Sequence, residues 1–160
     1  MKLCFAVQLA FGKGGLYGEA LYLGTEDAFR PERITQIAFN HFSKDTIEVN
    51  LLNFKIQEVL TRIHVRKINT HADDLYNIIL NGELDSFLDF HSLVKLLILD
   101  SISYLFRYDY DNENAIRVQK LIRIASKLKE ISHKRNIAVS TKKKVNLYII
   151  EKVFFYISYL

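Results

Sequence analysis

The sequence predicts an α/β domain with a mostly parallel sheet flanked by helices. The first observation is the stretch Leu93–Asp100, whose unbroken apolar run Leu96–Leu99 ends abruptly on a carboxylate and is typical of a strand buried on both faces. The second is the alternation of short strand patterns with helical patterns along the chain, which favours β-α units. The third is the composition: 160 residues, 49% of them hydrophobic, with one Pro and six Gly, indicate a single globular domain.

The first third of the chain predicts a helix, a loop, a strand and a second helix. Apolar residues at helical spacing make Met1–Phe11 the later turns of a helix. Gly12–Gly18 is predicted to be a surface loop, because a phosphate-binding P-loop needs Ser or Thr after its lysine and here another glycine follows. Ala20–Thr25 is a short strand, and Pro31–Phe42 is a helix with its proline in the first turn. The polar stretch Ser43–Asn50 is predicted to be a loop.

The rest of the chain continues the pattern of strands and helices. Ile63–Ile68 alternates as a strand does, and Thr70 is a candidate cap for a helix that runs to Leu80 with acids in its first turn. After the apolar run, Arg107–Asn114 is predicted to be a polar loop and Ala115–His133 a long helix. Asn136–Ser140 is a fourth candidate strand.

Charge is distributed unevenly. The formal net charge is +4 and the pI is about 9.1, yet Glu130 is the only acid between Arg117 and Lys144, and residues 73–89 contain no Lys or Arg. The base-rich part either faces a polyanion or is a solvated basic helix face. Lys142–Lys144 is open to three interpretations: nucleic-acid binding, a localisation signal, or solvated charge.

Several classes of protein are not expected. The lone Cys4 excludes an intrachain disulfide framework and favours a reducing, intracellular compartment. The five histidines show no metal-ligand spacing, so His64 and His71 are predicted to be ordinary positions. Gln8 interrupts the first apolar run, which therefore does not predict a signal peptide. Val145–Leu160 is too short for a membrane span and carries two charges, so no membrane partner is expected.

Carboxylates follow two of the predicted strands. Asp100 ends the buried strand and Ser101 comes next, while Glu26 and Asp27 lie just past Ala20–Thr25. Ligands of open α/β sheets bind beyond the carboxyl ends of the strands, so Asp100 is placed to meet a nucleotide-bound Mg²⁺, as in a Walker B strand. The alternative is that Asp100 only starts a turn or caps a helix.

Three segments together, in their order and spacing, resemble the ATPase core of eukaryotic RecA-like DNA recombinases: Gly14–Leu16, Leu21–Arg33 and Leu96–Asp111. The nearest match is the recombinase paralogue of the X-ray-repair cross-complementing type. The resemblance implies an incomplete RecA-like P-loop ATPase core over residues 1–141, with a divergent tail at 142–160. It also implies a nuclear protein of homologous recombination that uses ATP and Mg²⁺ in its intact form during double-strand-break repair. The implied partners are single-stranded and junction DNA and other recombinase paralogues.

The resemblance assigns a role to individual residues. It matches Glu26 to the catalytic carboxylate that orients the attacking water, and Asp100 to the acid near Mg²⁺, with Ser101 beside the nucleotide. Such positions suit phosphoryl transfer, which depends on a placed metal and an oriented water. Arg107, Tyr110 and Arg117 correspond to the first DNA-binding loop, where Arg107 would contact phosphate and Tyr110 would stack on a base.

The sequence departs from the family pattern in three places. It begins just beyond the position of the Walker A loop, Asp111 and Glu113 make the DNA loop more acidic, and the polar sensor residues expected after Val139 are replaced by Ser140–Lys144. The chain is therefore expected to be truncated at both ends and, without the Walker A contacts to the triphosphate, not to hydrolyse ATP appreciably by itself. The rival interpretations are an inactive adaptor of the same family that acts through protein contacts, and an unrelated α/β nucleotide-binding enzyme.

Overall fold

The computed structural model describes residues 1–25, 29–45, 48–68 and 71–141. Within these ranges four parallel strands form one sheet in the order β2-β1-β3-β4. The strands are β1 (Glu19–Gly24), β2 (Ile63–Lys67), β3 (Val94–Asp100) and β4 (Ala138–Thr141). The expected α/β class with a parallel sheet is confirmed.

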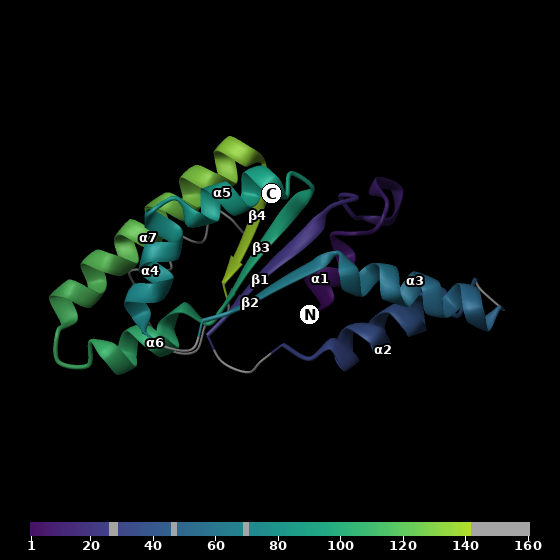
Figure 1. The fold of residues 1–160 in the computed structure, drawn as a ribbon, viewed down its shortest axis with the longest axis horizontal. Coiled ribbons are helices and arrows are strands. Elements are labelled where there is room, and N and C mark those ends of the chain that lie inside the picture. Colours follow the sequence, from purple (N-terminus) through teal and green to yellow (C-terminus); the bar gives the residue numbers. More distant parts are fainter. Residues whose placement is uncertain (26–28, 46–47, 69–70, 142–160) are drawn as a thin grey trace.

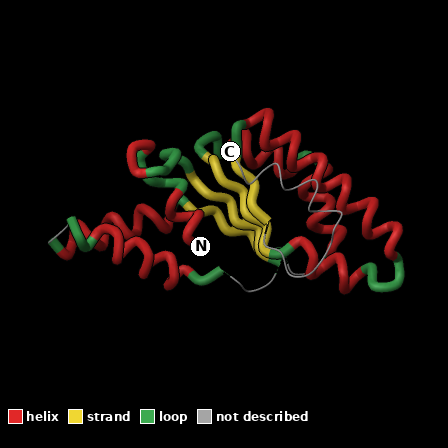
Figure 2. The backbone as a smooth tube through the Cα atoms, turned by 180° about the vertical axis from the view of Figure 1, so that it is seen from behind, coloured by secondary structure: helices red, strands yellow, loops and turns green. Residues whose placement is uncertain are grey.

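Helices cover both faces of the sheet (Figure 1). The helices α1 (Lys2–Ala6), α2 (Pro31–Phe42) and α3 (Val49–Thr61) pack on one face, and α4 (Ala72–Leu80), α5 (Glu83–Phe90) and α7 (Asn114–Arg135) on the other. The short helix α6 (Ile102–Asp109) follows β3 directly and lies at the carboxyl end of the strands. Figure 2 shows the same three layers from behind. No helix in the described ranges is long and apolar enough to cross a bilayer.

Strand β3 lies inside the sheet, between β1 and β4. Leu97 and Leu99 point into the core under α4, α5 and α7, whereas Leu96 and Ile98 point into the core under α1, α2 and α3. All four side chains are buried. This double burial is the physical reason for the unbroken apolar run, because neither face of the strand meets water.

Strand β2 forms an edge of the described sheet, and its burial does not follow the alternation of its sequence, although residues 63 and 65 share one face of the strand. Ile63 is buried, whereas Val65 is 47% exposed. Parallel pairing with β1 confirms the strand predicted over Ile63–Ile68: β2 itself ends at Lys67, and the Ile68 N–H still donates to the carbonyl oxygen of Gly24 at 2.7 Å.

The glycine-rich loop after α1 is shaped by close packing. A Cβ atom at Gly15 would lie 2.0 Å from the carbonyl oxygen of Leu9, and one at Gly18 would lie 2.4 Å from Cγ of Lys95. Most other residues of this loop are exposed, as predicted for Gly12–Gly18. A single 3₁₀ turn at Phe11–Lys13 interrupts the loop conformation. Side chains at Gly15 and Gly18 are thus excluded by neighbouring atoms of the protein itself.

The main differences from the sequence-based expectation concern helices. α2 has the predicted bounds, but α3 begins inside the stretch predicted as a loop, Ser43–Asn50, and neither α3 nor α5 was predicted. α3 buries Leu52, Ile56 and Val59. Its entry carries no side-chain cap hydrogen bond, so the usual start signal is missing.

Two helix ends differ from the sequence-based prediction. Thr70 lies outside the described residues, and the N-cap of α4 is His71, whose backbone N–H donates to Asp74 at 3.1 Å. The stretch predicted as a polar loop, Arg107–Asn114, is helical at its start, since α6 continues to Asp109. No helix was predicted here from the sequence, and burial of Leu105 and Phe106 accounts for α6, because its apolar face packs into the core.

Candidate nucleotide site and DNA loop

The carboxyl ends of β1 and β3 are neighbours at one edge of the sheet. Gly24 is in register with Asp100, and the backbone N–H of Thr25 donates to the carbonyl oxygen of Asp100 at 2.9 Å. The parallel pairing therefore brings Thr25 next to Asp100 and Ser101, which are far away in sequence. This is the edge at which open α/β sheets bind ligands.

Asp100 is buried, with 9% of its surface exposed, and its carboxylate is held by the neighbouring strand. The hydroxyl of Tyr22 donates to Oδ2 of Asp100 at 2.6 Å, and Tyr22 itself is 1% exposed. A short hydrogen bond from a fully packed phenol fixes the direction of the carboxylate. Tyr22 was not recognised as a site residue from the sequence, where its only signal is a polar group inside an apolar strand.

Thr25 clamps the backbone at Ser101. Its hydroxyl donates to the carbonyl oxygen of Ser101 at 2.8 Å and accepts from the Ser101 N–H at 3.0 Å. The peptide bond between Asp100 and Ser101 is cis. Thr25 was also not recognised as a site residue, because its side-chain partner lies 76 positions further along the chain.

The hydroxyl group of Ser101 is a candidate ligand for a metal ion. Its Oγ is buried and has no hydrogen-bond partner among the described residues. Buried hydroxyl groups in native proteins are almost always paired, so an orphaned one calls for a specific explanation. Carboxylate and hydroxyl oxygens are hard donors of the kind that Mg²⁺ prefers, so Asp100 and Ser101 fit a nucleotide-bound magnesium. Glu26, the predicted catalytic residue, lies outside the described residues.

The segment after α6 is tied to the body of the domain through Tyr110. The Tyr110 hydroxyl donates to Oδ1 of Asp73 at 2.5 Å, its ring stacks on Phe106 with 6.0 Å between centroids, and Nζ of Lys120 lies 4.7 Å above the ring. Lys120 also pairs with Asp73. A base that stacked on Tyr110 would have to replace some of these contacts.

The pKa values in this cluster reflect the contacts. Hydrogen bonds from Lys120 and then Tyr110 lower the pKa of Asp73. Burial first, and then the hydrogen bond to Asp73, raises the pKa of Tyr110. Burial opposes a rise in the pKa of Lys120, but its hydrogen bonds to Asp73 and Tyr110 outweigh that effect. The cluster is therefore a charged tether between α4 and α7.

The other two predicted DNA-binding residues flank this tether. Arg107 is half-buried in the last turn of α6. Arg117 lies in the first turn of α7, where its guanidinium donates to the side chain of Asn114. The Nε atom of Arg117 is buried and has no partner among the described residues, so this side chain retains an unused donor.

Several of the basic residues of α7 form ion pairs with acidic residues of the stretch 73–89, so the uneven charge of the sequence is partly neutralised within the fold. The basic helix α7 packs on α4 and α5, which carry the acid-rich stretch 73–89. Lys127 pairs with Asp85 at 3.0 Å, and Arg135 pairs with Asp85 at 3.3 Å and with Asp89 at 2.7 Å. These contacts raise the pKa of Lys127 and Arg135. Much of the basic face therefore meets acids of the same chain, which is neither of the two alternatives considered from the sequence.

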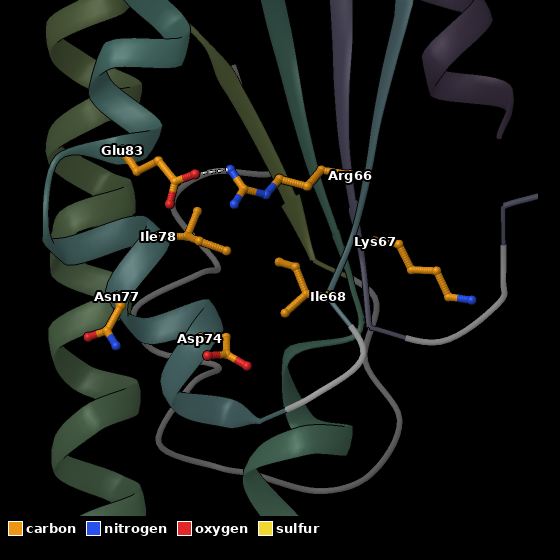
Figure 3. Close-up of a pocket in the computed structure, with 7 residues that line it drawn as sticks. All are labelled: Arg66, Lys67, Ile68, Asp74, Asn77, Ile78 and Glu83. Carbon is orange, nitrogen blue, oxygen red and sulfur yellow. Dashed lines mark ion pairs between the residues drawn. The ribbon is translucent and has the colours of Figure 1, made fainter.

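A cavity of about 480 Å³ lies beside the end of β2, between that strand and α4 (Figure 3). Arg66 extends from β2 to Glu83 at the start of α5, and the two form an ion pair of 2.5 Å. Asp74 and Asn77 line the opposite wall along α4. The acids of this wall offset the basic side chains of β2, so the lining has no marked preference for a polyanion.

The sequence matches one family model, described as Rad51, over residues 1–151. The DNA repair and recombination protein RadA of Metallosphaera sedula is 35% identical over 142 residues, which cover 87% of this chain and 39% of the relative. The RadA protein of Methanocorpusculum labreanum is 37% identical over 125 residues, covering 76% of this chain and 38% of the relative. The DNA repair protein RAD51 homolog 3 of Dictyostelium discoideum is 27% identical over 151 residues, covering 90% and 39%. The chain thus spans less than half the length of these relatives.

Proposed function

Since this chain belongs to the Rad51 family, we propose that it forms part of the ATPase core of a protein that repairs DNA by homologous recombination. Membership of the family agrees with the RecA-like resemblance seen in the sequence, and the parallel α/β sheet is consistent with a partial RecA-like core. We assign the partial core to residues 1–141 and regard 142–160 as a separate tail. A nuclear location in double-strand-break repair is part of the same proposal.

The observation that carries the proposal is the arrangement at the end of β3. Tyr22 orients the Asp100 carboxylate, Thr25 fixes the following peptide, and the Ser101 hydroxyl has no partner among the residues that the structure describes. In the intact protein Asp100 and Ser101 would hold the Mg²⁺ of bound ATP, and the metal would supply charge neutralisation at the phosphates. Glu26 is proposed to orient the attacking water.

The contribution of Tyr22 and Thr25 is positional. Tyr22 lies in β1 and Thr25 directly follows it, both are buried, and both form hydrogen bonds to the segment that carries the proposed ligands. Groups that are fixed before the nucleotide binds need little reorganisation when it does. We therefore expect substitutions of Tyr22 to affect nucleotide binding through Asp100.

We further propose that the segment around α6 contacts DNA, with Arg107 and Arg117 meeting phosphates and Tyr110 stacking on a base. Arg117 lies in the first turn of α7, directly after this loop. Asp111 and Glu113 are exposed on the same loop, so we expect affinity for single-stranded or junction DNA to be weak and sensitive to salt. Other recombinase paralogues are the proposed protein partners.

The nucleotide part of the proposal is tested on the native protein that carries these residues, by titrating a fluorescent ATP analogue with and without Mg²⁺. Removing a charge-assisted contact worth about 1.5–3 kcal/mol should weaken Mg²⁺-dependent binding by about 10–100-fold in Asp100→Asn. Asp45→Asn, at an exposed position between α2 and α3, is the matched control and should bind as the unaltered protein does. Equal binding by the two variants would contradict the assignment of Asp100.

The DNA part is tested with single-stranded DNA at low and raised salt. Arg107→Glu and Arg33→Glu change the net charge equally. Arg33, however, lies on α2, on the far side of the sheet, where its bond within the described part of the chain is to Gln36 of the same helix. A loss of affinity restricted to Arg107→Glu supports a contact at the loop. Equal losses of affinity in both variants would mean that only net charge matters. If Arg107→Glu keeps the affinity of the unaltered protein, the loop does not contact DNA and that part of the proposal fails.

One observation favours a second candidate, an adaptor of the same family that acts through protein contacts. The ring of Tyr110 is already occupied by Phe106 and Lys120, and its hydroxyl by Asp73. If this protein is an adaptor, its Asp100→Asn variant should bind a recombinase paralogue with the same affinity as the unaltered protein does. Loss of partner binding in that variant, together with loss of ATP binding, would favour the ATPase.

A further inference from the structure

Three potential metal ligands meet at the edge of the sheet opposite the proposed nucleotide site. Glu19 is the first residue of β1, His64 is the second residue of β2, and His91 follows α5 and precedes β3. One ligand atom from each lies within 4.8 Å of the other two. About six residues of strand, or roughly 20 Å, separate this edge from Thr25.

The cluster is built on fixed backbone. Glu19 donates its N–H to the carbonyl oxygen of Leu93 at 2.8 Å, and His91 donates its N–H to that of Phe87 at 2.9 Å. His64 lies within the paired part of β2, opposite Leu21. Ligands on hydrogen-bonded elements hold a metal site more accurately than ligands on free loops.

The side chains are also oriented. Nε2 of His64 and Oε2 of Glu19 are 2.6 Å apart, and the rings of His64 and His91 have centroids 4.2 Å apart. Phe87 packs against both imidazoles: it stacks on His91 at 4.3 Å and meets His64 edge-on at 5.5 Å. The phenyl ring thus restricts the rotation of both histidines while leaving their nitrogens directed at the cluster.

Two imidazoles and one carboxylate form a ligand set that is used for zinc and related ions. Bonds of about 2.0–2.1 Å at tetrahedral angles place ligand atoms about 3.3 Å apart. The Glu19–His64 contact would open slightly and His91 would move inward, and small side-chain rotations can supply both changes. All three residues are only partly buried, with side-chain exposures of 17% for Glu19 and 23% for His64, so an ion can reach them.

We propose that Glu19, His64 and His91 bind a divalent transition-metal ion of the zinc class, with water completing the coordination. The ion ties β1 and β2 to the connection between α5 and β3. Its role at this place is structural: it joins the amino-terminal ends of strands whose carboxyl ends carry the proposed nucleotide site. The site is independent of the Mg²⁺ proposed at Asp100, because it lies at the other end of the strands and contains nitrogen ligands.

The sequence does not show this site because its three ligands are 45 and 27 positions apart and follow no metal-binding spacing. His64 was expected to be an ordinary strand position for lack of a partner cluster. Parallel pairing of β1 with both β2 and β3 supplies that cluster, since it brings the starts of three strands to one edge.

The test titrates the full 160-residue chain, purified with a chelator, with Zn²⁺ against a chromophoric indicator, and repeats the titration with Co²⁺ to read its visible absorption. One ion per chain is expected, and an excess of about a hundredfold over Kd should raise the thermal midpoint by about 5–10 °C. His91→Asn should weaken binding at least about tenfold. His133→Asn, at an exposed position on α7, removes a histidine elsewhere and should bind as the unaltered chain does.

A second variant tests the proposal in case His91→Asn fails to fold. Glu19→Gln keeps a hydrogen-bonding group beside His64 but removes the charged ligand, and it should also weaken Zn²⁺ binding while its metal-free thermal midpoint stays close to that of the unaltered chain. Zn²⁺ binding by His91→Asn and Glu19→Gln that equals binding by His133→Asn would overturn the proposal, as would the absence of any binding by the unaltered chain. Asp100→Asn should leave the Zn²⁺ titration unchanged, which separates this site from the proposed function.

Discussion

Replacing Thr25 with Val tests whether this side chain holds the end of β3 in place. Valine has nearly the same shape, so the change removes the hydroxyl while the packing is largely kept. In the native structure that hydroxyl pairs with both the N–H and the carbonyl oxygen of Ser101, at 3.0 and 2.8 Å. Ser101 is 1% exposed, so its N–H would be left without a partner in a dry environment.

The magnitude follows from the number of groups affected. An orphaned buried donor costs about 1–3 kcal/mol, and the carbonyl oxygen loses less because it has a second lone pair. We expect the free energy of unfolding of Thr25→Val to fall by about 2–3 kcal/mol. For a chain of this size that corresponds to a drop of about 5–10 °C in the thermal midpoint.

The assay is urea unfolding followed by far-ultraviolet circular dichroism, with Thr61→Val as the matched control. Thr61 is exposed at the end of α3, and its hydroxyl donates to the nearby carbonyl oxygen of Glu58 at 2.8 Å. Its loss should change the free energy of unfolding by less than about 0.5 kcal/mol. If the two valine variants lose the same amount, the clamp at Ser101 contributes nothing special and the reasoning is refuted.

Three further outcomes are expected. Asp85→Asn leaves Lys127 and Arg135 of α7, which are both partly buried, without the carboxylate that they share. Urea unfolding should show a free energy of unfolding lower by about 1 kcal/mol, whereas the exposed control Asp45→Asn should change it very little. Burial raises the pKa of the Cys4 thiol above its ordinary 9.0, so alkylation at pH 8 should be far slower in the folded chain than in urea, and equal rates would contradict the burial. Tyr110→Phe removes a hydrogen bond that lowers the pKa of Asp73. A lowered pKa stabilises the fold above about pH 3.8, and this stabilisation is lost as the pH falls through the pKa of the folded state. The free energy of unfolding should therefore differ from that of the unaltered chain by about 1 kcal/mol or less at neutral pH, and the difference should shrink below pH 3.8.

The arrangement of the proposed nucleotide site was only partly predictable. Asp100 and Ser101 were recognisable because a buried strand must end in polar residues where it leaves the core. Tyr22 and Thr25 were not, since their roles consist of hydrogen bonds to residues 78 and 76 positions away. The helices α3, α5 and α6 were not predicted, and at α3 the missing side-chain cap removed the usual start signal.

The sequence by itself determined the layers of this protein. Local patterns were enough for this, because a strand buried on both faces must be apolar throughout, and an edge strand or a surface helix must alternate or repeat with its own period. The family also follows from the sequence, since the matched segment covers residues 1–151.

Only the tertiary structure decided which distant residues face one another. The acids of α4 and α5 neutralise the bases of α7, and Glu19 meets His64 and His91, because the sheet and the helix packing set those distances. Charge and ligand contacts depend on separation in space. A chain that folds through parallel crossovers brings together residues tens of positions apart, at spacings that no local pattern records.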